Sequence, residues 1–298
     1  MNIVEEIKKL NVGDVLENVD ISKYTTYNVG GHALAMVFPK DIYSLIELMK
    51  FIKYYHIKYK VIGRGSNLIF SSGLYNGILI KLDHFDDLEI NGNEITVGAG
   101  FQLIKLATRL SRIGYTGIEF ATGIPGSVGG AIFMNAGAYK SDMGYIVKSV
   151  KVLTPELKVI ELTNYDLDFH YRTSFLQKNP GYICLQATLI LKKGDADEIM
   201  QLIDDRKKRR IASQPLEYPS AGSVFRNPEG DFAGRLIEDA GYKGKRIGGA
   251  MVSTKHANFV INIDHATGED IKKLILEIKQ VVKEKYNIDL KIEQEFVE

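Results

Sequence analysis

The chain has 298 residues, 45% hydrophobic and 25% charged, a composition typical of a globular protein with a sizeable core. Its 38 basic and 37 acidic residues leave a net charge of +1, so no overall field favours nucleic acid or an acidic membrane. One cysteine, Cys184, excludes an intramolecular disulfide, and no apolar run approaches the roughly 20 residues of a membrane span. We therefore expect a cytoplasmic protein.

The first predicted elements are a helix and a strand that leads into a glycine-containing loop. Residues 41–56 have apolar side chains at helical spacing behind Asp41, a residue type that caps helices. The expected apolar face consists of Ile42, Leu45, Ile46 and Met49. The run YKVI at 59–62 predicts a strand that enters the loop GRGSN at 63–67.

From residue 77 the chain consists of short apolar runs broken by glycine, which predicts a strand-rich middle. The runs are GILIKL, EITVGAG, KSVKVL, KVIEL and GYICLQATLILK. Because Cys184 falls in the last of them, we expect it in the core. Residues 195–211 return to a helical pattern. The end of the chain predicts strand, helix and strand in HANFVIN, GEDIKKLILEIKQVVKEKYN and LKIEQEF.

Two glycine motifs suggest nucleotide binding, but each lacks a required residue. The segment ITVGAGFQLIKLATRL resembles a dinucleotide fingerprint with Glu119 further on, yet Leu103 occupies the third glycine position. A tight strand-to-helix turn is the simpler interpretation. In GYKGKRIGG, Arg246 follows Lys245 where a P-loop has Ser or Thr, so we exclude that motif.

A pair of loops, GRGSN and GIPGSVGGAIFMNAGAY (123–139), makes a better case for an anionic ligand. Glycines are expected to leave backbone N–H groups unshielded, and consecutive N–H groups in turns form concave sites suited to a pyrophosphate. The glycines are Gly63, Gly65, Gly123, Gly126, Gly129 and Gly130, with Ser66, Asn67 and Ser127 as side-chain donors. The alternative is two tight turns that pack against each other.

Six motifs follow one another from about Tyr27 to Phe296. They are TYNVGGHA (26–33), GRGSN, GIEFATGIPGSVGGAIFMNAGAY (117–139), YRTSF (171–175), PSAGSVFRNP (219–228) and LKIEQEF (290–296). In this order they resemble the UDP-N-acetylenolpyruvoylglucosamine reductase family. The resemblance implies a flavoprotein of peptidoglycan precursor synthesis, with non-covalent FAD, NADPH as hydride donor and UDP-N-acetylglucosamine enolpyruvate as substrate. Nucleic acid, membrane and metal are not expected as partners.

The resemblance also implies an α+β fold. The expected FAD-binding unit has two α+β subdomains of the PCMH-type flavin fold, at 21–75 and 76–198. An N-terminal helical segment, 1–20, precedes it. A C-terminal α+β substrate-binding domain, 199–298, is expected to close over the nucleotide sugar.

The resemblance assigns three sets of site residues. The catalytic residues are Arg172, the proton donor Ser223 and the carboxylate of Glu293. The cofactor-binding residues are Gly63, Arg64, Gly65, Ser66, Asn67, Gly123, Pro125, Gly126, Ser127, Gly129, Gly130, Ala131, Gly137 and Ala138. The substrate-binding residues are Tyr139, Arg210, Asn227 and His256. Without the resemblance, Arg172 would be a surface ion-pair residue, Ser223 a turn residue and Glu293 a solvated strand residue.

Two positions depart from the family pattern. Many relatives have Lys just before the QPLE segment and Gly after GAY, where this chain has Ser213 and Lys140. The phosphate contacts therefore stay open. Only 50 residues separate Arg172 from Ser223, which leaves little room for the tyrosine-bearing substrate loop of the longer class and implies the shorter class.

Other interpretations stay open beside this one. A flavin oxidase on the same scaffold would often tether its flavin through His or Cys, and GIPGSVGG contains neither. A non-enzymatic binding module is a third class. The six histidines lack metal-ligand spacing, so we expect no metal. RKKRR at 206–210 fits a solvated helix end that complements the helix dipole, with Arg210 at a UDP phosphate as the alternative.

Overall fold

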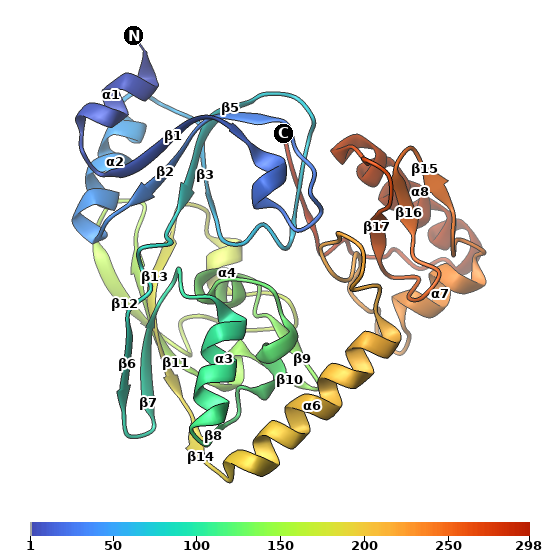
Figure 1. The fold of residues 1–298 in the computed structure, drawn as a ribbon. Helices are drawn as coiled ribbons and strands as arrows, with labels where there is room; N and C mark the ends of the chain where they lie inside the picture. The colour runs from blue at the N-terminus through green and yellow to red at the C-terminus, as the bar shows by residue number, and fades with distance from the viewer. Residues whose placement is uncertain (1) are drawn as a thin grey trace. The chain divides into compact units, whose positions relative to one another are not determined.

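The computed structural model describes residues 2–298, which pack into two compact units (Figure 1). Unit 1 consists of the described residues of Met1–Glu17 together with Ala35–Arg64 and Gly77–Lys207. Unit 2 consists of Asn18–Leu34, Gly65–Asn76 and Lys208–Glu298. Each unit combines segments that are far apart in the sequence, and the consecutive domains proposed above stay a prediction.

The first part of unit 1 is built on a four-stranded sheet in the order β1-β2-β5-β3. The strands are β1 (Gly13–Asp20), β2 (His32–Pro39), β3 (Tyr59–Ile62) and β5 (Tyr75–Lys81), with helices α1 (Ile3–Lys9) and α2 (Ile42–Tyr54). Some end residues of β1, β2 and β5 belong to unit 2. The helical segment predicted for residues 1–20 is correct only for α1, because β1 follows it.

The predicted helix behind Asp41 is confirmed as α2. The Asp41 carboxylate accepts a hydrogen bond from the Ser44 N–H at 2.7 Å, which satisfies one of the unpaired donors of the first turn. The buried face is rotated relative to the prediction, since Ile42 is 37% exposed. Its buried apolar residues are Leu45, Leu48, Met49 and Ile52.

The second sheet of unit 1 is antiparallel, with strand order β12-β11-β13-β7-β6. Its strands are β6 (Leu88–Asn91), β7 (Glu94–Gly98), β11 (Val147–Leu153), β12 (Val159–Thr163) and β13 (Ile183–Ile190). The five predicted strand runs after residue 77 are therefore confirmed, as β5 and four strands of this sheet. Cys184 lies in β13 and is buried, which raises the pKa of its thiol to about 12.

Short helices and hairpins complete unit 1. They are α3 (Leu103–Arg112), β8 (Tyr115–Thr116), η2 (Glu119–Gly123), α4 (Val128–Phe133), β9 (Gly137–Ala138), β10 (Ser141–Asp142), η3 (Met143–Tyr145), α5 (Phe175–Lys178) and β14 (Lys192–Lys193). The predicted strand-to-helix turn is confirmed, because β7 ends at Gly98 and α3 begins at Leu103. A Cβ on Gly98 or Gly100 would overlap a backbone carbonyl, that of Phe85 or Leu82.

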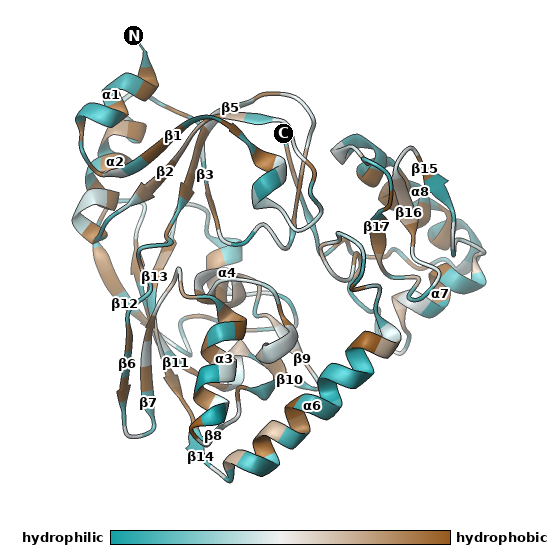
Figure 2. Ribbon diagram, in the orientation of Figure 1, coloured by the Kyte–Doolittle hydropathy of each residue, from teal (hydrophilic) through white to brown (hydrophobic). Residues whose placement is uncertain are grey.

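The long helix α6 (Ala196–Ser213) runs from unit 1 into unit 2 and confirms the helix predicted at 195–211. Only Ile199 and Ile203 are buried on it, and most of its length is coloured as hydrophilic in Figure 2. The basic run at 206–210 lies in its C-terminal half, where positive side chains interact favourably with the helix dipole.

Unit 2 contains the helix α8 (Gly268–Tyr286), which buries one face in the core of the unit. Thr267 and Asp270 form a capping box at its start, and Asn287 ends it with a φ of 57°. Its buried residues Ile271, Leu274, Ile275, Ile278 and Val282 belong to the apolar core of the unit. The other elements are η1 (Ile21–Tyr24), β4 (Leu68–Phe70), α7 (Ala233–Asp239), β15 (Arg246–Ile247), β16 (Ala250–Val252), β17 (Val260–Asn262) and β18 (Glu295–Val297).

The predicted strand, helix and strand at the end of the chain are confirmed as β17, α8 and β18. Strand β17 is the edge of an antiparallel sheet in the order β15-β16-β17, and β18 pairs in parallel with β4. The last strand is shorter than its motif, because before Glu295 the chain forms only an isolated bridge, between Ile292 and Phe225. Within residues 2–298, no helix has the length and apolar character needed to cross a membrane.

Candidate active site

The predicted cofactor residues differ in their burial. Buried are Gly65, Ser127, Ala131 and Gly137; exposed are Arg64 and Pro125; half-buried are Gly63, Ser66, Asn67, Gly123, Gly126, Gly129, Gly130 and Ala138. The boundary between the two units falls between Arg64 and Gly65. The loop GRGSN is therefore divided between the two units.

In unit 1, the loop 123–130 uses some of its N–H groups within the protein. The N–H of Gly129 donates to the carbonyl of Ala99 at 2.8 Å, and that of Gly130 donates to Ser127 Oγ at 3.2 Å. The second bond is an N-cap of α4. The expectation that these two N–H groups are unshielded is therefore wrong.

The two glycine loops pack against each other within unit 1. A Cβ on Gly63 would lie 2.5 Å from Ser127 Oγ, and a Cβ on Gly129 would lie 3.0 Å from Ala99 Cβ. Both distances are shorter than van der Waals contact allows. The packing alternative thus accounts for Gly63, while Gly129 packs against Ala99, which lies outside both loops. The contact of these two glycines with a cofactor stays a prediction.

In unit 2, the second half of GRGSN is tied to the segment that contains Glu293. A Cβ on Gly65, whose φ is 62°, would overlap the Tyr24 carbonyl, so glycine is needed here. The Asn67 amide donates to the Glu293 carbonyl at 3.0 Å, and the Glu295 N–H donates to the Asn67 carbonyl at 2.9 Å. Asn67 thus holds the backbone of a predicted catalytic residue, a role that its motif alone does not reveal.

Lys81 is a buried cation that the sequence analysis missed. Its Nζ donates to the Gly63 carbonyl at 2.8 Å and lies 3.3 Å from the Asp83 carboxylate. Burial lowers the pKa of its ammonium group, and the charge of Arg64 adds to this effect. A lysine within the apolar strand run GILIKL was the available signal, because lysines are rarely buried without a partner. Positive charge beside a glycine turn fits the diphosphate of a dinucleotide such as FAD.

Arg172 lies in a tight turn fixed to the glycine-rich segment. Its φ is 56°, and the backbones of His170 and Thr173 exchange hydrogen bonds of 2.9 and 3.0 Å across the turn. The Asn135 amide donates to the His170 carbonyl at 2.8 Å. Arg172 Nη2 donates to the Gly137 carbonyl at 2.8 Å, so the structure brings the predicted catalytic arginine to the predicted cofactor segment.

Tyr139 and Lys140 form the two-residue loop of the β9–β10 hairpin. Their φ values of 55° and 61° correspond to a type I′ turn, in which Asn and Gly are the preferred residues. The Tyr139 hydroxyl donates to the Arg206 carbonyl at 3.2 Å, and the Arg206 guanidinium lies 4.6 Å from the ring centroid. Where many relatives have glycine, which adopts this conformation without strain, this chain thus has the strained residue Lys140. It lies beside the predicted substrate residue Tyr139.

In unit 2, the residue after Ser223 is held on two sides. The Val224 N–H donates to the Asn258 carbonyl at 2.9 Å, and the Glu293 N–H donates to the Val224 carbonyl at 2.8 Å. The Asn258 side chain accepts from the Phe225 N–H at 3.0 Å and donates to the Phe225 carbonyl at 2.8 Å. The structure therefore brings the backbones of the predicted residues Ser223 and Glu293 close together.

The remaining predicted substrate residues of unit 2 lie on separate segments, two in loops and one in α6. His256 Nδ1 accepts from the Asn258 N–H at 3.2 Å, and burial lowers the pKa of the imidazole, so the ring is neutral at pH 7 with its proton on Nε2. Asn227 is exposed, and its Oδ1 accepts from the Ala233 N–H at the start of α7. Arg210 lies in the last turn of α6. The substrate contacts of all three stay predictions.

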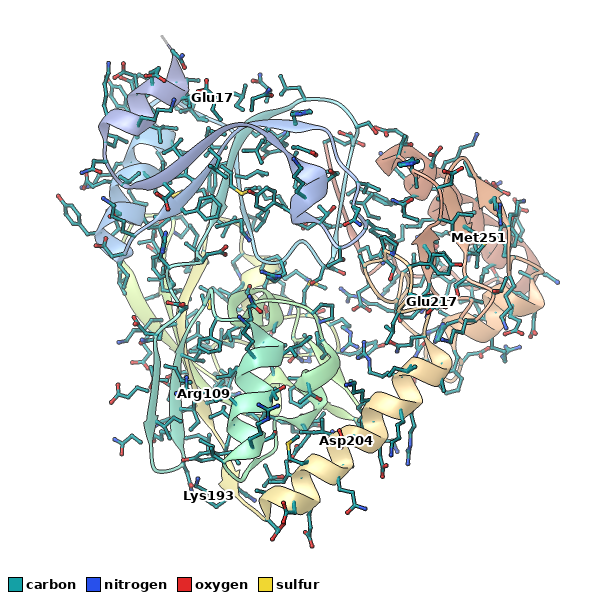
Figure 3. The ribbon with its side chains drawn as sticks, in the orientation of Figure 1. Glu17, Arg109, Lys193, Asp204, Glu217 and Met251 are labelled. Carbon is teal, nitrogen blue, oxygen red and sulfur yellow. The ribbon has the colours of Figure 1, made fainter. Side chains whose placement is uncertain are left out.

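The segment after α6 is held by an ion pair and a hydrogen bond within unit 2. Glu217, labelled in Figure 3, lies 3.7 Å from Lys255 Nζ, which also donates to the Ile211 carbonyl at 2.6 Å. Ser213, the second departure from the family pattern, donates its hydroxyl to the Arg209 carbonyl at 2.8 Å. It therefore interacts with its own helix.

A further pocket in unit 1 contains no predicted catalytic residue. This shallow pocket of about 370 Å³ is lined by Lys140, Tyr145 and Lys192, among others. No group of three or more His, Cys, Asp or Glu side chains in residues 2–298 is arranged to hold a metal ion.

Family models match both parts of the chain. A model for an FAD-binding domain matches residues 33–163, and one described as "UDP-N-acetylenolpyruvoylglucosamine reductase, C-terminal domain" matches residues 214–297. The fold and these matches define an FAD-dependent oxidoreductase. The chain is 47% identical over 296 residues to the UDP-N-acetylenolpyruvoylglucosamine reductase of Halalkalibacterium halodurans, which covers 99% of this chain and 98% of that protein. With the same coverage, it is 44% identical to the reductase of Bacillus subtilis. The chain therefore belongs to the UDP-N-acetylenolpyruvoylglucosamine reductase family.

A solved structure supports the same conclusion. The crystal structure of the UDP-N-acetylenolpyruvylglucosamine reductase from Thermus caldophilus matches with a TM-score of 0.82 at 32% identity. The match covers 96% of this chain and 98% of that one. The predicted α+β fold, with an FAD-binding unit and a C-terminal domain of the reductase type, is confirmed.

A first prediction concerns the strained turn at Lys140. The variant Lys140→Gly should stabilise the protein by about 0.5 kcal/mol, since relief of the left-handed conformation exceeds the added chain entropy. The same change at Lys151, exposed in β11, should destabilise it by about 1 kcal/mol. Thermal unfolding of the two variants measures the difference, and a loss of stability in both would show that Lys140 is not strained.

A second prediction concerns Lys81. Lys81→Met should weaken FAD binding to the apoprotein about tenfold, because it removes a buried positive charge beside the predicted diphosphate loop. Titration with FAD fluorescence measures the Kd, and the difference should persist in high salt, because a buried charge is screened much less than an exposed one. Lys151→Met is the control. Lys81→Gln keeps an N–H donor without the charge, so wild-type affinity in this variant would mean that the charge plays no part.

Proposed function

We propose that the protein reduces the enolpyruvyl group of UDP-N-acetylglucosamine enolpyruvate with NADPH, forming UDP-N-acetylmuramate for peptidoglycan precursor synthesis. The observation that carries the proposal is the nearly full-length match to reductases of this name at 44% and 47% identity. The short distance in sequence between Arg172 and Ser223 supports membership of the shorter class.

Bound FAD would supply the hydride-transfer chemistry, and the chain's own residues would handle charge and a proton. Hydride addition to the terminal carbon of the enolpyruvyl double bond leaves negative charge on an enolate-like carboxylate. Arg172 would bind this carboxylate, because a guanidinium is planar, always charged and able to donate two parallel hydrogen bonds. Its fixed turn supports the proposal, since charge stabilisation depends on groups that are already in place.

The reaction needs one proton on the carbon next to the carboxylate, and Ser223 would donate it. A serine hydroxyl is a weak acid, but the acceptor is a strongly basic carbon, so a well-positioned weak acid can suffice. Ser223 would then regain a proton from solvent or from Glu293. Hydride and proton together complete the addition of two hydrogens across the double bond.

A direct test is NADPH oxidation, followed by absorbance with and without the enolpyruvyl nucleotide sugar. We expect strong stimulation by this sugar and none by UDP-N-acetylglucosamine, which lacks the double bond. An oxidation rate that does not respond to the enolpyruvyl sugar would contradict the proposal. Oxygen consumption with another reductant would instead support a flavin oxidase.

A further prediction separates the two halves of the reaction. Ser223→Ala should lose its flavin absorbance with NADPH at a near-normal rate, because that half needs no proton donation to substrate carbon. The return of absorbance with the enolpyruvyl sugar should slow by about 10²-fold to 10⁴-fold, the range for loss of a positioned general acid. Rapid mixing follows each half. Equal slowing of both halves would mean that Ser223 shapes the site and that the proton comes from elsewhere.

A further inference from the structure

A buried amide and a buried phenol hold the loop that carries Ser223. Gln294 is 4% exposed, and its Nε2 lies 3.1, 3.3 and 3.5 Å from the carbonyl oxygens of Ala221, Gly222 and Ser223. Tyr27 is fully buried, and its hydroxyl donates to Gln294 Oε1 at 2.9 Å. All of these groups belong to unit 2.

The three carbonyls and the Tyr27 hydroxyl together determine which way the Gln294 amide faces. Burial raises the pKa of Tyr27, so the phenol stays protonated and can donate. Because Gln294 Oε1 accepts that proton, the amino group must face the three carbonyls. An amide rotated by 180° would set its own oxygen against the three carbonyl oxygens, four acceptors with no donor among them.

The three carbonyls converge because of the backbone at Gly222. Its φ of 74° is a left-handed conformation that residues other than glycine rarely adopt. The hydrogen bond from the Gln294 amide to the Ala221 carbonyl is the shortest, at 3.1 Å, and those to the other two carbonyls are longer and weaker. This arrangement is a turn whose inner side is filled by one side-chain amide.

Ser223 is therefore anchored on both sides. Gln294 holds the backbone at and before Ser223, and Asn258 with the Glu293 backbone holds the next residue, Val224. Gln294 also follows Glu293 directly, so one short segment supports both predicted catalytic residues of unit 2. A proton donor needs this accuracy, because a displacement of about 1 Å can slow a reaction about 100-fold.

We propose that Gln294, held by its hydrogen bond from Tyr27, is a positioning residue for the proton donor Ser223. The inference rests on the proposed function, and it gives Gln294 and Tyr27 no contact with substrate or cofactor. Gln294 lies in LKIEQEF and Tyr27 in TYNVGGHA, 267 residues earlier. The positioning role thus gives a function to two motif residues that take no part in the proposed mechanism.

The test measures both half-reactions of Gln294→Met and Tyr27→Phe by rapid mixing. Gln294→Met removes the donors with little change in volume. It should slow the return of flavin absorbance with the enolpyruvyl sugar by roughly 10-fold to 100-fold. Tyr27→Phe should slow it less, by about 3-fold to 10-fold, because the amide keeps its bonds to the carbonyls and loses only the bond that fixes its other end. The first half, with NADPH, should proceed at the wild-type rate in both variants.

Tyr242→Phe is the matched control. Tyr242 is 6% exposed in the same apolar core, and its hydroxyl donates to Glu277 at 3.0 Å, away from the Ser223 loop. Its loss should lower the melting temperature about as much as Tyr27→Phe does, while both half-reactions stay normal. Slowing of the second half in this control as well would assign the effect to general loss of stability and overturn the proposal.

Two further variants distinguish positioning from a structural role. In a Ser223→Ala background, Gln294→Met should cause no additional slowing, because the group that it positions is gone. Equal slowing with and without the serine hydroxyl contradicts the proposal. Gln294→Glu should approach the wild-type rate at low pH, where a protonated carboxyl can donate to the carbonyls, and slow as pH rises and the carboxylate repels them. A rate in this variant that stays far below that of the wild type even at low pH would overturn the proposal, also if Gln294→Met does not fold.

Failure of the proposed function has a different signature. In that case the wild-type protein itself would not recover its flavin absorbance with the enolpyruvyl sugar. A wild-type protein that recovers, beside a Gln294→Met variant that recovers equally fast, would leave the function standing and exclude the positioning role.

Discussion

The geometry of the unit 2 site depends on the hydrogen bonds that the C-terminal segment makes along both of its sides. On one side, β18 pairs with β4, and Asn67 bonds to the backbone of Glu293 and Glu295. On the other side, the Glu293 N–H donates to the Val224 carbonyl. The segment therefore joins two motifs that lie far from it and from each other in the sequence. A backbone that is paired on both sides cannot shift without breaking several bonds, which suits a segment that carries a predicted catalytic carboxylate.

In unit 1 the predicted site residues are held in position in a different way. They lie in turns with left-handed residues, which side-chain hydrogen bonds fix. Asn135, Tyr139, Lys140 and Arg172 all have left-handed φ values between 42° and 61°. Such conformations persist only when surrounding contacts impose them, and they are concentrated at functional sites. The bonds from the Asn135 amide and the Arg172 guanidinium supply such contacts. These four residues thus lie at or near the predicted cofactor and substrate contacts, whereas other left-handed residues of unit 1, such as His56 and Leu157, lie elsewhere in the sequence.

The sequence predicts best what depends on local periodicity. The helix behind Asp41 and the strand runs after residue 77 have repeating apolar patterns, and the structure confirms them. Features that depend on partners distant in sequence escape prediction. In the sequence, Lys81 only interrupts an apolar strand run, and its role appears with the hydrogen bond to the Gly63 carbonyl. The glycines of the 123–130 loop indicate close approach of other atoms, but the sequence does not say whether those atoms belong to a ligand or to Ala99 and Ser127.

The Tyr27–Gln294 pair illustrates why such distant polar contacts persist in a core. Packing side chains of similar size without polar groups would avoid the burial of an amide and a phenol, and replacing both partners of a buried polar pair by apolar groups is often nearly neutral. Replacing both Tyr27 and Gln294 by apolar residues would not be neutral here, because backbone carbonyls are a third partner of the pair. The carbonyls at 221–223 would lose their side-chain donor, and for the buried Ala221 carbonyl this costs about 1–3 kcal/mol. The amide is thus required by the turn at Gly222, and the turn is what brings Ser223 to its place.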